Sequence, residues 1–166
     1  MSKEQYIKLM SFWGSHKSLL TAAEILQKSA VFVVYASFPL LLIFLFFNNF
    51  TLAVRVFLTC GISFLLASVI RARLNKPRPY EVFEHPSAIR KDKKGNSFPS
   101  RHVFSATIIA LCFFYTCPIA GIVFFLIAGI IAAMRVLLGV HFIKDVLFGA
   151  FLGILFGTVG LSIIIF

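Results

Sequence analysis

Long apolar runs, separated by short polar breaks, make up most of the chain. Five of these runs approach the length of a bilayer crossing, at about residues 29–47, 50–70, 100–117, 119–138 and 143–166. An α-helix needs about 20 predominantly apolar residues to cross the hydrocarbon core of a membrane. The pattern therefore predicts an all-α fold, a polytopic transmembrane helix bundle with about five spanning helices.

The segment before the first run has a different pattern, because charged residues alternate with apolar ones through residues 3–28. So many charges make a poor spanning helix, whereas an amphipathic helix can lie in the membrane interface. Phe12 and Trp13 would then sit at the depth of the lipid headgroups. We therefore expect an amphipathic interfacial helix at 1–28 and a transmembrane domain at 29–166.

The polar breaks between the runs differ strongly in charge. The turns at 48–49 and 117–118 contain no Lys or Arg, whereas the segment from Arg71 to Arg101 contains nine such residues. Five spans would place this segment, the N-terminal helix and the turn at 139–145 on the same face of the membrane. Polar functional groups are therefore expected to converge on one side.

The composition is typical of a membrane protein and argues against a protein that binds a metal or another cofactor. Hydrophobic residues make up 60% of the 166 residues, and the mean hydropathy is +0.96, whereas soluble domains are about 45–50% apolar. Cys60, Cys112 and Cys117 lie in or at the end of apolar runs without the spacing of metal ligands, so we interpret them as small buried hydrophobes. We expect no metal, no other cofactor and no nucleic-acid partner.

Three polar clusters meet on the predicted functional face, and the first two belong to a candidate catalytic loop at about 71–102. Arginine presents a planar fork of donors that matches phosphate oxygens. A helix that begins near Pro99 would add free N–H groups and a positive dipole end, which also favour an anion. The sequence therefore predicts a phosphate site. Its candidate residues are Arg71, Arg78, Ser100, Arg101, His102, Arg135, His141 and Asp145.

Two histidines could carry out chemistry on that phosphate. His141 and Asp145 are four residues apart, which places them on one face of a helix. The carboxylate could hold one ring nitrogen and leave the other free as a nucleophile. His102, on another helix, could protonate the leaving oxygen.

Each of these residues also has an ordinary structural interpretation. Arginines beside apolar runs are often interface anchors, and a His–Asp pair is often only a satisfied structural pair. Arg135 fits this interpretation least well, because a cation deep in an apolar run is by default a functional candidate.

The three motifs together resemble the type 2 phosphatidic acid phosphatase family of membrane lipid phosphatases, over about residues 50–160. The motifs are Arg71-x6-Arg78-Pro79, then Pro99-Ser100-x-His102, then Arg135-x5-His141-x3-Asp145. The resemblance implies that His141 attacks phosphorus and forms a phosphohistidine, that Asp145 orients it and that His102 protonates the leaving group. It also implies phosphate binding by Arg71, Arg78, Ser100, Arg101 and Arg135, without a metal.

The chain departs from the family pattern at three positions. Arg71 stands where the family usually has Lys, Arg101 where it usually has Gly, and Met134 where it often has Ser. None of these changes removes a catalytic group, so they affect the expected substrate preference more than the expected activity.

The resemblance favours an enzyme that hydrolyses a lipid phosphate or diphosphate. We expect undecaprenyl diphosphate as substrate, with phosphatidylglycerol phosphate and phosphatidic acid as alternatives. Two other functions stay open: a lipid phosphotransferase on the same scaffold, and a non-enzymatic anion transporter that uses the basic face.

The expected location is the cell membrane, as a multi-pass protein among membrane lipids, with the N-terminus and the active site on one face. The positive-inside rule places that face in the cytoplasm, whereas the resemblance favours the outer side. The sequence leaves both orientations open, and nothing in it indicates an oligomeric state.

Overall fold

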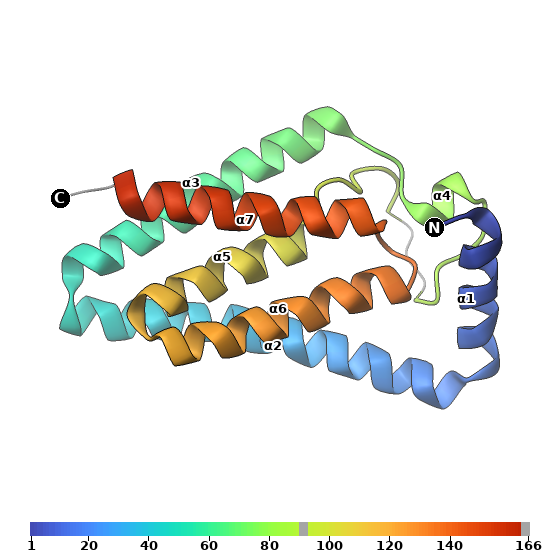
Figure 1. Cartoon of the computed structure of the whole chain (residues 1–166), viewed down its shortest axis with the longest axis horizontal. Helices are drawn as coiled ribbons and strands as arrows, with labels where there is room; N and C mark the ends of the chain where they lie inside the picture. Colours follow the sequence, from blue (N-terminus) through green and yellow to red (C-terminus); the bar gives the residue numbers. More distant parts are fainter. Residues whose placement is uncertain (90–92, 164–166) are drawn as a thin grey trace.

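The computed structural model describes residues 1–89 and 93–163, and these residues form seven helices without a strand (Figure 1). This confirms the predicted all-α fold. The helices are α1 (Lys3–Ser15), α2 (Lys17–Asn48), α3 (Phe50–Leu74), α4 (Pro79–Val82), α5 (Arg101–Thr116), α6 (Pro118–Leu137) and α7 (Ile143–Ile163).

The helix ends follow from local residue chemistry. Asn49 separates α2 from α3, and its side-chain oxygen accepts a hydrogen bond from the N–H of Leu52 at 3.0 Å, which caps α3. Asn75 ends α3 in the left-handed conformation, with φ 37°, which asparagine tolerates better than most residues. Pro118 starts α6, where its missing N–H costs no hydrogen bond.

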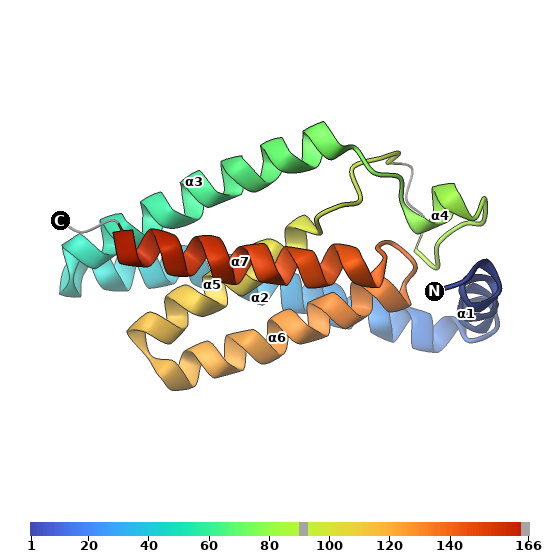
Figure 2. The ribbon, with the colours of Figure 1, turned by 45° about the horizontal axis from the view of Figure 1, so that its top comes forward.

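Helix α5 forms the centre of the bundle. It packs against α2, α3, α6 and α7, and every side chain from Val103 to Cys112 is buried. Figure 2 shows it between the longer helices. Its position makes it the natural platform for a site at its N-terminal end.

Four of the five expected spans are long and apolar enough to cross a membrane: α2, α3, α6 and α7. Helix α5 corresponds to the expected third span, at about 100–117, but its 16 residues are fewer than this requires. They cover about 24 Å at 1.5 Å per residue, which is less than the roughly 30 Å of the hydrocarbon core. Of the expected last span, residues 164–166 lie outside the described residues.

The prediction of a single amphipathic helix over residues 3–28 is wrong. Helix α1 ends at Ser15, and α2 begins at Lys17 and continues without interruption into the first span, so residue 28 lies within α2. The chain turns at His16, whose N–H bonds to the carbonyls of Phe12 and Trp13. Helix α1 then crosses the end of the bundle (Figure 1), where tertiary contacts hold it.

The polar segments gather at one end of the bundle, as the sequence predicted. Helix α1, helix α4 and the turn between α6 and α7 all lie there, whereas the turns after α2 and α5 lie at the opposite end (Figures 1 and 2). The N-terminal end of α5 points toward the polar end. The three candidate clusters are therefore brought together by the helix directions.

Candidate active site

The turn between α6 and α7 carries His141. Two backbone N–H groups, those of Val140 and His141, both donate to the carbonyl of Arg135 at 3.1 Å. Gly139 takes a left-handed conformation, with φ 73°, which glycine adopts without strain. The turn thus fixes Arg135 and His141 close to each other.

Helix α1 holds this turn from the outside. The Tyr6 hydroxyl donates to the carbonyl of Gly139 at 3.3 Å, and the Trp13 indole donates to the carbonyl of Leu137 at 2.8 Å. A side chain at Gly139 would lie 2.8 Å from the sulfur of Met10. Helix α1 is therefore in direct contact with the segment that carries His141, and burial raises the pKa of the Tyr6 phenol to about 12.

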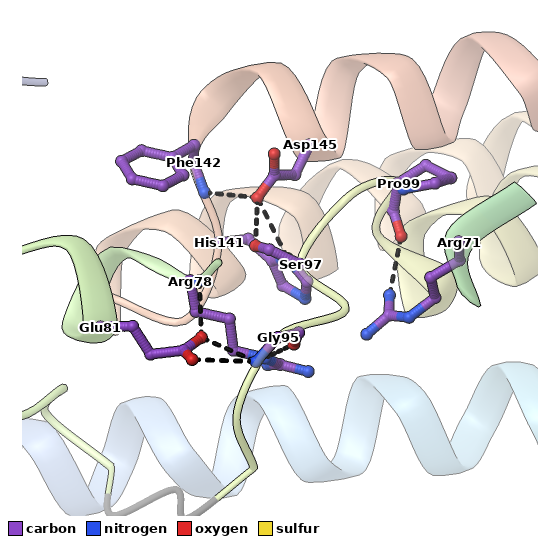
Figure 3. Close-up of polar contacts among 9 residues, drawn as sticks. All are labelled: Arg71, Arg78, Glu81, Gly95, Ser97, Pro99, His141, Phe142 and Asp145. Atoms are coloured by element: carbon purple, nitrogen blue, oxygen red, sulfur yellow. Dashed lines mark hydrogen bonds and ion pairs between the residues drawn. The ribbon is translucent and has the colours of Figure 1, made fainter. Parts of the chain in front are cut away.

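Asp145 and Ser97 face the same nitrogen of His141. Asp145 Oδ2 lies 3.5 Å from His141 Nδ1, and Ser97 Oγ lies 3.3 Å from it (Figure 3). Asp145 Oδ2 also accepts hydrogen bonds from the Ser97 hydroxyl at 2.5 Å and from the N–H of Phe142 at 3.0 Å. Since these contacts occupy the Nδ1 side of the ring, Nε2 is the nitrogen left available.

The surroundings of His141 keep its ring neutral. Its side chain is buried, and burial lowers the pKa of His141 to about 4 because a charged imidazolium loses hydration. The hydrogen bond with Asp145 raises the pKa, but the positive charges of Arg135 and Arg78 lower it further. A neutral ring retains a lone pair at neutral pH.

The N-terminal end of α5 is anchored to the start of α7. The N–H of Ser100 donates to the backbone carbonyl of Asp145 at 2.9 Å. Gly149 permits this approach, because a Cβ there would lie 2.7 Å from the carbonyl oxygen of Ser100. The segment at 97–100 is therefore fixed relative to the residues that orient His141.

Three arginines approach the site from different segments. Arg71 donates to the carbonyl of Pro99 at 2.7 Å, and Arg78 Nε donates to the carbonyl of Gly95 at 3.0 Å. Arg135 is only 5% exposed, and its Nε has no partner. In the part of the chain that the structure describes, no carboxylate lies within ion-pair distance of these guanidiniums. They therefore leave an excess of positive charge in the site.

A cavity of about 760 Å³ opens between these groups. Six of the eight predicted site residues line it: Arg71, Arg78, Arg101, His102, Arg135 and His141. Lys93 and Lys94 add further positive charge to its wall. The size and charge of the cavity suit a phosphorylated ligand.

The other two predicted residues lie behind the cavity wall. Asp145 contacts His141 from behind, as described above. Ser100 is fully buried and precedes the first residue of α5, but its hydroxyl neither caps the helix nor has any other hydrogen-bond partner. The structural contact of Ser100 is made by its backbone N–H, which donates to the carbonyl of Asp145.

Arg101 differs from the other arginines because its side chain is exposed. Its guanidinium lies over the ring of Phe64, 5.7 Å from the ring centroid, a distance typical of a cation–π contact. It reaches the cavity from α5, beside His102.

Sequence reasoning missed two residues that organise the site. Ser97 makes the contacts with His141 and Asp145 given above. The Glu81 carboxylate accepts hydrogen bonds from the N–H groups of Arg78 and Gly95, at 2.8 Å and 2.9 Å, and so joins α4 to the loop before α5 (Figure 3). Ser97 stands close to the quoted second motif, but only the fold reveals that its hydroxyl reaches Asp145.

No group of three or more His, Cys, Asp or Glu side chains that could hold a metal occurs within residues 1–89 and 93–163. The donors around the cavity are mainly guanidiniums, which repel cations. The residues described here thus suit an anion better than a metal ion.

Comparison with known proteins gives two kinds of match. A family model described as the PAP2 superfamily matches residues 52–165. The structure of LpxE from Aquifex aeolicus is similar, with 26% sequence identity, a TM-score of 0.72 and 95% of each chain covered. A PAP2 type phosphatidylglycerolphosphate phosphatase from Bacillus subtilis shares the fold, with 24% identity, a TM-score of 0.60, and 95% of this chain and 94% of that chain covered. No curated protein matches the sequence.

Proposed function

This chain belongs to the PAP2 superfamily, and on that basis we propose that it is an integral-membrane lipid phosphatase that works through a phosphohistidine on His141. The observation that carries this proposal is the arrangement of the His141 ring. Nδ1 faces Asp145 and Ser97, while the ring lines a cavity whose other walls carry arginines. A neutral, oriented imidazole beside an anion site is the arrangement that a nitrogen nucleophile requires.

In the first step, Nε2 of His141 attacks the phosphorus of the substrate. The bond between Nε2 and phosphorus forms as the bond between phosphorus and the leaving oxygen breaks. The negative charge of the bound phosphate favours the protonated form of His102, and the leaving oxygen keeps the electron pair and takes a proton from this imidazolium. Asp145 accepts the hydrogen bond from Nδ1–H and stabilises the positive charge that develops on the ring, as the acid does in a serine hydrolase triad.

In the second step, water attacks the phosphohistidine. His102, now neutral, takes a proton from the water as the oxygen–phosphorus bond forms and the nitrogen–phosphorus bond breaks. Inorganic phosphate leaves, and His141 returns to its neutral form. Each histidine therefore ends the cycle in its starting state.

The arginines would stabilise the phosphoryl group during both steps. Arg71, Arg78 and Arg135 have no carboxylate partner among the described residues, so their charge is available to the substrate. Preorganised cations act most strongly where charge spreads over the phosphoryl oxygens in the transition state. The positive charge of these three arginines could take the place of a metal ion. We therefore include metal independence in the proposal.

The position of the cavity supports a lipid substrate. It lies at one end of a bundle whose outer surface is largely apolar, next to the short helix α5. A phosphorylated headgroup could enter the cavity while its hydrocarbon chains stay in the bilayer. Undecaprenyl diphosphate, phosphatidylglycerol phosphate and phosphatidic acid all have this form.

Replacement of the nucleophile tests the proposal. Purified His141→Ala should bind a lipid phosphate but release inorganic phosphate at a rate lower by roughly 10⁴-fold or more, as for other covalent nucleophiles. His16→Ala, which changes an exposed histidine between α1 and α2 that does not line the cavity, serves as the control and should keep full activity. Trapping with a ³²P-labelled lipid should label the wild type in an acid-labile form. Normal turnover in His141→Ala would refute the mechanism.

A further inference from the structure

The carbonyl groups at the end of α6 are completed by two different sets of donors. The last four carbonyls of a helix have no partner within the helix. The carbonyls of residues 134–136 accept hydrogen bonds from N–H groups of the turn that carries His141. The next three accept from outside the turn: Leu137 from the Trp13 indole at 2.8 Å, Leu138 from the N–H of Ala88 at 3.2 Å, and Gly139 from the Tyr6 hydroxyl at 3.3 Å. Two of these three donors belong to α1.

His141 depends on this turn because no helix contains it. Helix α6 ends at Leu137 and α7 begins at Ile143, so His141 lies in the link between them. Arg135, by contrast, belongs to the last turn of α6 and keeps its place with that helix. A change in the backbone at 137–139 would therefore move the nucleophile relative to the phosphate site. A displacement of about 1 Å can cost about 100-fold in rate.

Helix α1 presents one face to the turn. Tyr6, Met10 and Trp13 are spaced by four and three residues, which places them on one side of a helix, and all three are buried. A capping box stabilises the first turn of this helix. Figure 1 shows α1 across the end of the bundle. Helix α1 lies outside residues 52–165, which the family model matches, so family membership assigns it no role.

Tyr6 joins three segments of the molecule. In addition to its bond with Gly139, its hydroxyl lies 3.4 Å from the carbonyl of His85. Its ring centroid is 5.1 Å from that of Phe83, and the Phe83 ring lies 5.8 Å from the ring of Phe142. The ring contacts therefore pack the loop after α4 and the turn against α1, whereas the hydroxyl holds a carbonyl of the turn. Loss of the hydroxyl alone would leave the ring contacts in place.

We propose that Tyr6 is a positioning residue for the nucleophile, because its hydroxyl holds the Gly139 carbonyl and so fixes the turn from which the His141 ring reaches phosphorus. Trp13 acts in the same way through the carbonyl of Leu137. Tyr6 does not line the cavity that would hold the phosphate, so it acts only through the turn. This inference rests on the proposed phosphatase function and extends it to a helix that carries none of the three motifs.

The experiment removes one oxygen atom. Tyr6→Phe keeps the ring, and Tyr115→Phe makes the same change at an exposed position near the opposite end of the bundle. The substrate is whichever of phosphatidic acid, phosphatidylglycerol phosphate and undecaprenyl diphosphate the wild type hydrolyses fastest, labelled with ³²P. In rapid-quench single turnovers, Tyr6→Phe should form the phosphohistidine about three- to tenfold more slowly, the range for one neutral hydrogen bond.

The binding of phosphate should not change in the same variant. Arg71, Arg78 and Arg135 keep their places, so KM and the inhibition constant of inorganic phosphate should stay at the wild-type values. A general loosening of the fold would weaken these constants together with the rate. Tyr115→Phe should keep the wild-type value of every constant.

A second variant and a second control lie in α1 itself. Trp13→Phe removes the other donor to the turn, should give the same separation of rate from binding, and decides the question if Tyr6→Phe does not fold. Ser11→Ala removes a hydroxyl that bonds to carbonyls of α1 and should change neither quantity.

Three results would overturn the inference: phosphohistidine formation at the wild-type rate in Tyr6→Phe, an equal loss in Tyr115→Phe, or a loss of rate accompanied by an equal weakening of phosphate binding. In each of these cases His141→Ala remains inactive, so the proposed function stands. Failure of the wild type to hydrolyse any of the three lipids would instead remove the proposed function itself.

Discussion

Replacement of Ser97 by alanine tests whether the Asp145 side of the His141 ring is organised as described. Ser97 is fully buried, and its hydroxyl donates to Asp145 Oδ2 at 2.5 Å while lying 3.3 Å from His141 Nδ1. Ser97→Ala removes one of the donors that fix the carboxylate. The N–H of Phe142 still holds the same oxygen at 3.0 Å, so the carboxylate loses part of its orientation.

The size of the effect follows from the type of bond. A hydrogen bond to a charged group contributes about 1.5–3 kcal/mol, and each 1.36 kcal/mol changes a rate tenfold. If the whole loss appears in the transition state, kcat should fall by about 10- to 150-fold. KM should change little, because Ser97 does not line the cavity that holds the phosphate.

The assay measures kcat and KM separately, together with the rate of phosphohistidine formation in rapid-quench experiments with a ³²P-labelled lipid. The first step should slow by the same factor as kcat. Ser63→Ala removes another buried serine hydroxyl, from α3 and away from His141, and controls for a general loss of packing or stability.

Two results would refute the reasoning. A rise in KM at constant kcat would mean that Ser97 acts on substrate binding. An equal loss of kcat in Ser97→Ala and Ser63→Ala would mean that the effect is a general consequence of removing a buried hydroxyl, without a specific role in positioning His141.

Three further predictions concern protonation, metals and substrate preference. Burial, with the nearby arginine charges, lowers the pKa of His141 to about 4, so an NMR titration of the free enzyme should find its ring neutral down to about pH 4. A midpoint near the ordinary value of about 6.5 would contradict this. Hydrolysis should persist in excess EDTA, and vanadate, which mimics a five-coordinate phosphate, should inhibit it; loss of activity in EDTA with rescue by a divalent cation would mean that the site is misassigned. Arg101→Gly should lower kcat/KM for a prenyl diphosphate more than for the monophosphate, by about 10- to 100-fold, and an equal loss on both would leave Arg101 as an interface anchor.

The helical class and the meeting of the three motifs could be predicted from the sequence for a simple reason. Apolar runs of membrane-spanning length have few alternative structures, because every backbone polar group in a bilayer must be bonded within the segment. The number of such runs then sets which loops share a face. With five runs, an odd number, the three motifs around His141 were expected on one face. The structure brings six of the eight candidate residues to one cavity wall.

The N-terminal segment could not be predicted in the same way. Its alternating pattern is compatible with one long helix or with two, and local propensity does not decide between them. The break at His16 is stabilised by tertiary contacts, since Tyr6, Met10 and Trp13 bury against the turn that follows α6. Such contacts join residues more than 120 positions apart and leave no periodic signal near residue 16.

The two residues missed by sequence reasoning illustrate a second limit. The spacing of a motif identifies residues that contact the substrate. It does not identify the residues that hold those catalytic side chains in place. Ser97 and Glu81 act through hydrogen bonds to Asp145 and to the backbone of Gly95, so their role depends on where the loop runs. A serine and a glutamate in a polar loop are too common to be noticed without that path.

The glycines of α7 connect packing inside the bundle to the chemistry at its end. Gly149, Gly153 and Gly157, spaced four residues apart, all face α5, where added side chains would clash. The contact at Gly149 lies against the carbonyl of Ser100, next to the hydrogen bond from Ser100 N–H to the Asp145 carbonyl. Side-chain volume at this position therefore sets the distance between His102, at the start of α5, and the pair formed by Asp145 in α7 and His141 in the turn before it. Because His141 must reach the phosphorus while His102 reaches the leaving oxygen of the same phosphoryl group, the glycine contact in the apolar part of the bundle is a geometric condition for the proposed reaction.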